Sequence, residues 1–362
     1  MKLFKCQCGN LLFFDNSICL QCGSQVGYEP DKREMRAIDA DGGLVCCANG
    51  VTYGACNWLV VPLPQNEGDP PPPPLLCKSC QLTQTIPDLT EPNNVMLWAR
   101  TEAAKRRLLV TFDLLGISLP PKSVDPVRGI AFDLISRKTS PELMMGHLNG
   151  NITVHVDEAD DTEREITRNH LNEPVRTMLG HFRHESGHYI WERWQNPLPP
   201  DDPQRLAFRE IFGDETQTEY AAAIAKNYQE GPAADWQSHH ITAYASSHPW
   251  EDWAETWAFY LQMVDGLETV DAMGLQQGRK TPYVKAFPAE AGMLPAMLPQ
   301  KSRHDAAFLE WLNRWITFST VLNELSKSLG HAPMHPFVIS IPVVRKLRLI
   351  HWLVEEFRNQ PA

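Results

Sequence analysis

His184-Glu185-Ser186-Gly187-His188 is the stretch of this chain from which its fold is best predicted. Its two histidines are four residues apart, so on a helix both imidazoles lie on one face and can bind one metal ion. The glutamate between them can accept a proton from a water at that ion. The same spacing also occurs by chance on amphipathic helices with surface histidines. The neighbouring sequence is therefore needed to distinguish a metal site from a chance match.

The residues before this stretch favour a buried helix that starts near Pro174. Apolar residues recur there at helical spacing: Val175, Met178, Leu179 and Phe182. His184, Glu185 and His188 continue that inward face, where histidines need a polar partner and a metal supplies one. We expect His181, one turn earlier, to be a hydrogen-bonded neighbour and not a ligand.

A catalytic zinc needs a third protein ligand and an open position. The segment 249–263 is predicted to be a tryptophan-rich helix on which Glu251 and Glu255 share a face. Acids on an apolar face are costly unless a positive group meets them. A zinc ion would satisfy Glu251, and Glu255 could accept the second N–H of a zinc-bound histidine. Glu255 as the ligand is the main alternative, and Asp214 and Glu215 are weaker ones.

This Glu251-x-x-Ala254-Glu255 segment resembles that of the glutamate zincins, or gluzincins, in which the first glutamate binds the metal and the second acid lies behind it. Similarity to families like the anthrax lethal factor peptidase domain implies that Tyr244, seven residues earlier, stabilises the oxyanion. The expected chemistry is peptide hydrolysis by a zinc-activated water, with Glu185 as the general base.

The segment 151–157 alternates apolar and polar residues and is predicted to be a half-buried strand. In zincins the corresponding strand is an open sheet edge that pairs with extended substrate, so we expect such an edge here. The acidic run 157–165 is expected to be a solvated loop.

Cysteine spacing is the second strong signal, and all nine cysteines precede residue 81. Cys6 and Cys8, then Cys19 and Cys22, form two short pairs that are each followed by a glycine. Tight knuckle turns favour such glycines, and four thiolates from two knuckles suit tetrahedral zinc. The less regular second group would supply these ligands to another zinc: Cys47, Cys56, Cys77 and Cys80. Cys46 is then left free.

Charge and cysteine usage limit the class of partner. The 362 residues have a formal net charge of −11, and residues 1–90 carry six Lys/Arg against nine Asp/Glu. Nucleic-acid binding relies on neutralising phosphates, so neither a nucleic-acid partner nor a membrane is expected. The two cysteine groups, interpreted as zinc ribbons, are expected to be structural or to bind a protein partner. An odd cysteine count and an amino terminus that lacks a signal-peptide pattern favour metal ligands over disulfides, and we expect a cytoplasmic protein.

The predicted class is α+β, with a mostly helical zincin-like core. Residues 1–90 are expected to form the zinc-ribbon region, 91–266 the catalytic domain, and 267–362 a helical subdomain packed on that core. Residues 92–115 are predicted to form one long helix, with Glu102, Lys105, Arg106 and Arg107 on its wet side.

Taken together, these motifs resemble those of bacterial zinc-binding metallopeptidases that carry an amino-terminal zinc ribbon. The matching stretches are 6–10, 56–58, 86–89, 102–107, 180–185, 212–215 and 248–255. One departure is Phe259, where the family usually has a histidine. The resemblance implies a zinc peptidase with one catalytic and one or two structural ions. The alternative is a zinc-stabilised regulatory protein whose zincin domain binds peptides without cleaving them, although the intact Glu185 favours cleavage.

Overall fold

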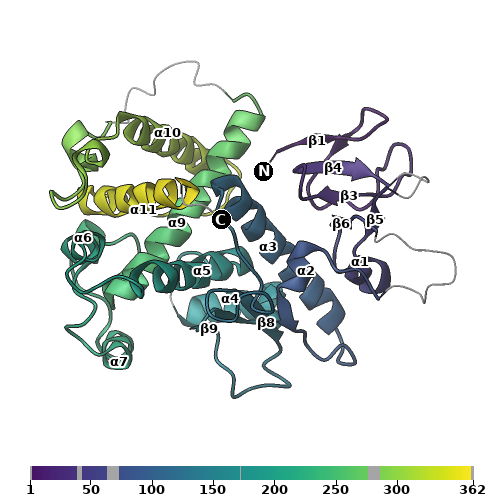
Figure 1. Ribbon diagram of the computed structural model, residues 1–362, viewed down its shortest axis with the longest axis horizontal. Helices are drawn as coiled ribbons and strands as arrows, with labels where there is room; N and C mark the ends of the chain where they lie inside the picture. The colour runs from purple at the N-terminus through teal and green to yellow at the C-terminus, as the bar shows by residue number, and fades with distance from the viewer. Residues whose placement is uncertain (1, 39–42, 63–72, 172, 276–285, 360–362) are drawn as a thin grey trace. The chain divides into compact units, whose positions relative to one another are not determined.

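Short hairpins form the amino-terminal segment of the computed structural model, which describes residues 2–38, 43–62, 73–171, 173–275 and 286–359 (Figure 1). β1 (Phe4–Lys5) pairs with β2 (Leu11–Leu12), β3 (Val26–Glu29) with β4 (Glu34–Ala37), and β5 (Val45–Cys46) with β6 (Leu59–Val60), all antiparallel. A short helix, α1 (Ala48–Tyr53), lies between β5 and β6, and another, α2 (Lys78–Gln81), follows β6. Tyr28 packs against Phe14 and Trp58 in a small core, and a core of this size depends on further cross-links for stability.

A four-stranded sheet follows, with strand order β7 (Thr83–Thr85), β8 (Ala131–Ile135), β10 (Asn151–His155) and β9 (Gly146–Leu148). β10 is the strand predicted at 151–157, but it pairs with β8 on one side and β9 on the other. The expectation that it is an open edge is therefore wrong. The edge strand beside it is β9, which is too short to stand out as an alternating pattern.

The helix predicted at 92–115 is α3 (Asn94–Leu115). Arg107 is partly exposed, as predicted, but Glu102, Lys105 and Arg106 are not on a wet face. Glu102 and Lys105 are fully buried and form an ion pair at 2.9 Å. The Lys105 ammonium also donates to the Ser79 carbonyl at 3.0 Å, and the Arg106 guanidinium donates to the Ala55 carbonyl at 2.8 Å. These side chains are buried because they satisfy each other and the carbonyls of the cysteine-rich loops.

The acidic run is not a loop. It forms a 3₁₀ turn, η1 (Val156–Ala159), and the start of α4 (Asp161–His170). Asp160 caps α4 by accepting from the backbone N–H groups of Thr162 and Glu163, because carboxylates are favourable at helix N-termini. Glu158 is buried and pairs with Arg176 at 2.8 Å. Burial alone would raise the pKa of Glu158, but His181 and Arg176 hold it well below its usual value.

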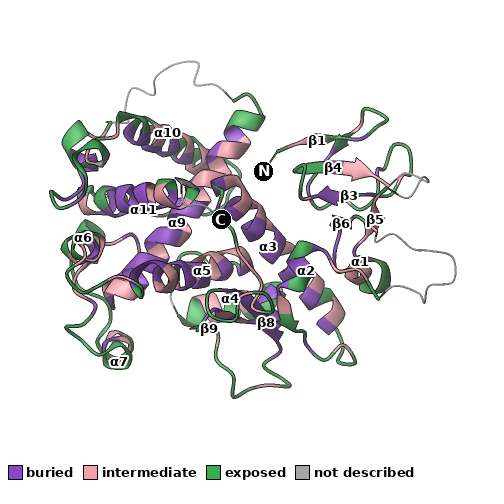
Figure 2. Cartoon of the chain, in the orientation of Figure 1, coloured by how far each residue is buried: buried purple, intermediate pink, exposed green. Residues whose placement is uncertain are grey.

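The remaining elements are helical. They are α5 (Met178–Gln195), α6 (Pro203–Phe212), α7 (Tyr220–Glu230), α8 (Trp236–His239), η2 (Tyr244–Ser246), α9 (Pro249–Ala272), η3 (Ala289–Gly292), η4 (Gln300–Ser302), α10 (Ala306–Ser328) and α11 (Ile341–Asn359). α5 begins four residues after Pro174, because the Thr177 hydroxyl accepts from the Gly180 N–H and caps the helix at that point. Figure 2 shows runs of buried residues along α5, α9 and α11.

The chain divides into two compact units. Unit 1 comprises residues 1–114, 118–182 and 268–275, and unit 2 comprises 115–117, 183–267 and 276–362. Small sheets, a cysteine-rich amino-terminal region and a helical carboxy-terminal region confirm the predicted α+β class. Among the helices that the structure describes, none combines the length and the apolar character that crossing a membrane requires.

Candidate functional site

In unit 2, Ser186 and Gly187 of the histidine motif form the packing surface between α5 and α9. A Cβ at Gly187 would lie 2.9 Å from the Ala254 Cα, so only glycine allows this approach. The indole N–H of Trp253 donates to the Gly187 carbonyl at 2.9 Å, and that of Trp257 donates to the Ser186 hydroxyl at 3.1 Å. With Ser186 and Gly187 against α9, the histidines on either side of them face the same helix.

The close packing brings His184, His188 and Glu251 together, with one ligand atom from each lying within 4.8 Å of the others. The two Nε2 atoms are 3.2 Å apart. The Glu251 carboxylate lies 3.1 Å from His184 Nε2 through Oε2 and 3.5 Å from His188 Nε2 through Oε1. Glu251 is buried, and its Oε2 accepts no hydrogen bond from the described residues.

These separations fit a zinc ion. Zinc bonds to histidine nitrogen and carboxylate oxygen are about 2.0–2.2 Å, so tetrahedral ligand atoms lie about 3.3 Å apart. The separations between the two Nε2 atoms, 3.2 Å, and between His184 Nε2 and Glu251 Oε2, 3.1 Å, are close to that value, and Glu251 Oε1 lies 3.5 Å from His188 Nε2. A buried carboxylate oxygen without a donor also needs a positive partner at this point.

Glu255, one turn further along α9, lies behind His184. Its Oε1 is 2.6 Å from His184 Nδ1, and its Oε2 accepts from the Thr242 hydroxyl at 2.8 Å. Because an ionised carboxylate can only accept, Nδ1 carries the hydrogen and the Nε2 lone pair of a neutral ring faces the other ligands. Burial opposes a charged imidazole, but Glu251 and Glu255 outweigh it and raise the pKa of His184, so its Nε2 binds a proton unless a metal ion takes that place.

Two tyrosines lie at this cluster. The Tyr244 ring centroid is 6.2 Å from that of His184, and burial with the nearby charge of Glu251 raises the Tyr244 pKa, so the phenol keeps its proton. Tyr220 donates to Glu251 Oε1 at 2.5 Å. Neither Tyr220 nor Thr242 was predicted, because each comes from a separate loop or helix start and has no fixed spacing from the histidines.

The other candidates lie elsewhere. Glu215 pairs with Arg209 at 2.8 Å and Asp214 pairs with the same guanidinium at 3.4 Å, so both are engaged away from the histidines. His181 lies 3.8 Å from the Glu158 carboxylate. Phe259 is buried against the ring of His335, with centroids 5.0 Å apart, in an apolar part of unit 2.

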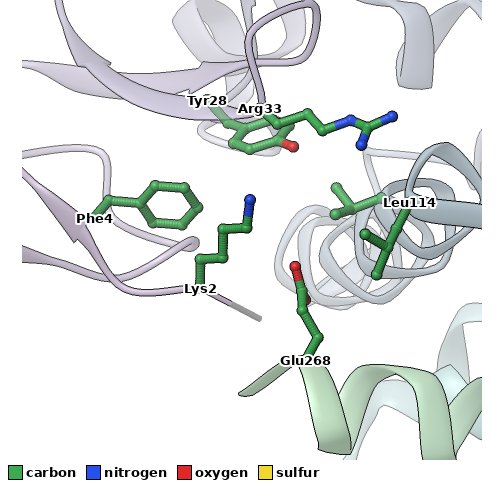
Figure 3. A pocket seen from close by; sticks show the side chains of 7 residues that line it. Lys2, Phe4, Tyr28, Arg33, Leu114 and Glu268 are labelled. Atoms are coloured by element: carbon green, nitrogen blue, oxygen red, sulfur yellow. The ribbon is translucent and has the colours of Figure 1, made fainter. Parts of the chain in front are cut away.

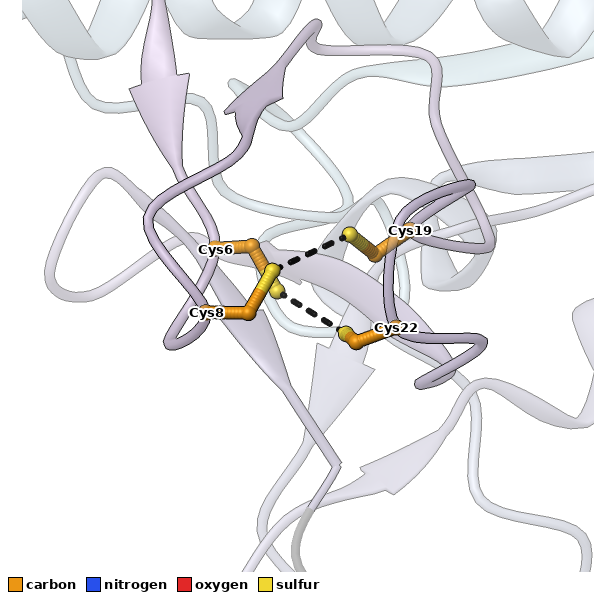
Figure 4. Close-up of side chains that lie close together, drawn as sticks. All are labelled: Cys6, Cys8, Cys19 and Cys22. Atoms are coloured by element: carbon orange, nitrogen blue, oxygen red, sulfur yellow. Dashed lines mark hydrogen bonds between the residues drawn. The ribbon is translucent and has the colours of Figure 1, made fainter.

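The cysteines form two groups of four in unit 1. Figure 4 shows the first: Cys6, Cys8, Cys19 and Cys22. Gly9 and Gly23 follow the two pairs with φ of +85° and +75°, a backbone conformation that glycine adopts without strain. Two Sγ–Sγ separations are 3.7 Å. Tetrahedral zinc with bonds of about 2.3 Å places sulfurs about 3.8 Å apart, so the geometry fits zinc.

The second group contains Cys47, Cys56, Cys77 and Cys80, all buried. The Cys56 and Cys77 sulfurs are 3.6 Å apart. Backbone N–H groups of Cys77 and Trp58 donate to the sulfurs of Cys47 and Cys56, at 3.4 Å each, which favours thiolates. Cys46 lies outside both groups, and burial raises its pKa.

Two further features of the described residues lie apart from these metal-binding groups. Asp305, His351 and Glu355 approach one another, but Arg348 lies 3.6 Å from Asp305 and its charge opposes a cation there. A small pocket in unit 1 has Phe4, Tyr28 and Leu114 among its walls (Figure 3). It shares no residue with the metal-binding groups.

Comparison with known proteins identifies the family of the chain and its amino-terminal domain. Residues 94–353 match the family described as "Putative zinc-binding metallo-peptidase", and residues 3–91 match a zinc-ribbon domain. Over 358 residues, 98% of this chain and 96% of each relative, the chain is 37% identical to mycobacterial proteins. They are "Uncharacterized protein Mb2598c" of Mycobacterium bovis and "Uncharacterized protein MT2644" and "Uncharacterized protein Rv2568c" of Mycobacterium tuberculosis. No solved structure matches. The chain belongs to this family of zinc-binding metallopeptidases.

Proposed function

We propose that this protein is a zinc-dependent peptidase of the gluzincin type. The observation that carries the proposal is the approach of the Glu251 carboxylate to both imidazoles. Its Oε2 lies 3.1 Å from His184 Nε2 and its Oε1 lies 3.5 Å from His188 Nε2, and the two Nε2 atoms are 3.2 Å apart. Two imidazoles and one carboxylate make a catalytic zinc set that leaves a position open. When bound there, zinc would polarise the scissile carbonyl and acidify a water.

The roles of the other residues follow from their chemistry. Glu185, beside His184 on α5, takes the proton of the attacking water and delivers it to the leaving amine. Tyr244, held in its protonated form, donates a hydrogen bond to the oxyanion. Glu255 fixes the His184 tautomer from behind. The substrate is a peptide or protein.

The rest of the chain supports this site. We propose that the two four-cysteine groups hold structural zinc ions and stabilise an amino-terminal region of residues 1–90, because so small a core depends on its metal. Residues 91–266 carry the chemistry. Tyr260 of α9 contacts His351 of α11 through a 2.9 Å hydrogen bond, which supports packing of a 267–362 subdomain on the core. Thiolate ligands need a reducing compartment, so the cytoplasm is the proposed location.

The test compares cleavage of a peptide library by the wild type and Glu185→Gln, followed by mass spectrometry. We expect wild-type cleavage and a loss of at least about a hundred-fold in the variant, as removal of a general base produces. Glu210→Gln, on the exposed face of α6, is the matched control and should cleave normally. Equal cleavage by wild type and Glu185→Gln would contradict the mechanism. No cleavage by either protein would contradict peptidase activity.

A further inference from the structure

Tyr220 is the residue at the candidate zinc site whose role the chemistry above does not use. It is the first residue of α7, and its hydroxyl donates to Glu251 Oε1 at 2.5 Å. The other oxygen, Oε2, is buried, lies 3.1 Å from His184 Nε2 and accepts nothing from the described residues. Oε1 lies 3.5 Å from His188 Nε2 but accepts the Tyr220 hydrogen bond, so the two oxygens of one carboxylate are in different environments.

The ring of Tyr220 packs against residues that neighbour Glu251 in the chain. It packs edge-on against His248, with centroids 5.3 Å apart, and lies 5.5 Å from the ring of Trp250. His248 and Trp250 flank the start of α9, three residues and one residue before Glu251 respectively. The hydroxyl is thus positioned by the same helix end that positions the carboxylate.

Tyr220 has little other support. Within α7 only Ala223 is buried, and most of the helix faces solvent. The Tyr220 side chain is partly exposed, and a phenol is ordinarily protonated at neutral pH, so the hydroxyl stays a donor. A permanent donor on one oxygen disfavours the use of that oxygen as a second metal ligand, since its lone pairs and charge are partly engaged.

We infer that Tyr220 is a positioning residue that makes Glu251 bind the proposed zinc through Oε2 alone. This inference rests on the proposed function and deepens it. A catalytic zinc must keep a position for water and substrate, and a carboxylate that binds through both oxygens would fill it. Tyr220 would keep that position open without contacting the reacting atoms.

The test is the visible absorption of protein that carries Co²⁺ at this site, with the ribbon zincs left in place. Four-coordinate Co²⁺ absorbs more strongly than five-coordinate Co²⁺. We expect the wild type to show the strong spectrum and Tyr220→Phe to show a weaker one, because Glu251 Oε1 is free to bind. The substitution removes only the hydroxyl, so the ring keeps its packing. Tyr228→Phe, on the exposed side of the same helix, is the matched control and should absorb like the wild type.

The outcomes separate this inference from the proposed function. If Tyr220→Phe keeps the wild-type spectrum and binds Co²⁺, the positioning role is wrong and the peptidase proposal stands. If the wild type, with zinc kept in its cysteine sites, binds no Co²⁺, both the positioning role and the proposed function fail. If Tyr228→Phe weakens the spectrum as much as Tyr220→Phe does, the effect belongs to α7 as a whole and the inference is overturned.

Discussion

His184 Nδ1 and Glu255 Oε1 lie 2.6 Å apart, so one carboxylate of α9 fixes the orientation of an imidazole on α5. Outer carboxylates of this kind raise the basicity of a histidine ligand, and their loss typically costs about 10–100-fold in metal affinity. We expect Glu255→Ala to weaken zinc binding at this site by that factor, measured by competition with a chromogenic chelator. Glu324→Ala, on the exposed face of α10, should leave it unchanged. Unchanged affinity in Glu255→Ala would show that Glu255 does not support the ligand.

Gly187→Ala tests the packing that brings the ligands together. The new Cβ would lie 2.9 Å from the Ala254 Cα, which is backbone and cannot move aside alone. We expect a loss of about 1–3 kcal/mol in unfolding free energy, as for other overpacked interiors, together with weaker zinc binding. Gly180→Ala meets only the Thr177 hydroxyl, so it should cost less. A stable variant with normal zinc affinity would contradict the proposed role of Gly187.

Lys346→Met tests the buried pair beneath the start of α9. The Lys346 ammonium lies 2.6 Å from Asp252, which is fully buried, and donates to the His239 carbonyl at 2.6 Å. Removing Lys346 leaves the buried Asp252 carboxylate with only the His240 ring beside its Oδ2, at 3.1 Å, and loss of one partner of a buried ion pair costs about 3–5 kcal/mol. Chemical denaturation should show this loss. Lys327→Met breaks an exposed pair with Glu324 and should cost less than about 1 kcal/mol. Equal effects would mean that Asp252 is solvated.

His335 predicts a pH dependence of stability. Burial among aromatic rings lowers its pKa to about 4. The unfolded chain, with a histidine pKa of about 6.5, therefore binds more protons than the folded chain between these values. The stabilising contribution of neutral His335 is full above about pH 6.5 and is lost as the pH falls toward about 4.

We expect the wild type to lose about 2 kcal/mol from this group between about pH 7 and pH 5, by the same relation. His335→Phe should remove that part of the loss, measured as the difference between denaturation curves of the two proteins at each pH. His331→Phe, which is exposed, should follow the wild type. Parallel pH profiles for wild type and His335→Phe would contradict the assignment.

Local patterns predicted several helices and the groups of side chains that lie together. The spacing of His184 and His188 and that of the cysteines correspond to the groups that the structure brings together. Such patterns work because ligands on one helix or one knuckle have their separation set by local geometry. Glu251 could also be predicted from the sequence, because an acid on an apolar helix face needs a positively charged partner.

What the sequence did not reveal depends on contacts between distant segments. Glu102 and Lys105 were expected on the solvent-exposed face of their helix, because charged side chains on helices usually face water. They are instead buried as an ion pair. In the acidic run, Glu158 is buried because Arg137 and Arg176 from other segments pair with it. β10 gained a second neighbour from the short strand β9. Tyr220 reaches Glu251 across 31 residues, and no spacing rule predicts that contact.

The central claim is that His184, His188 and Glu251 together bind one zinc ion, separate from the two cysteine sites. Counting zinc per chain in the purified wild type, Glu251→Ala and Glu255→Ala tests it most directly. At saturating zinc followed by removal of excess ion, we predict three, two and three ions per chain. Three ions in Glu251→Ala, or only two in the wild type, would contradict the claim.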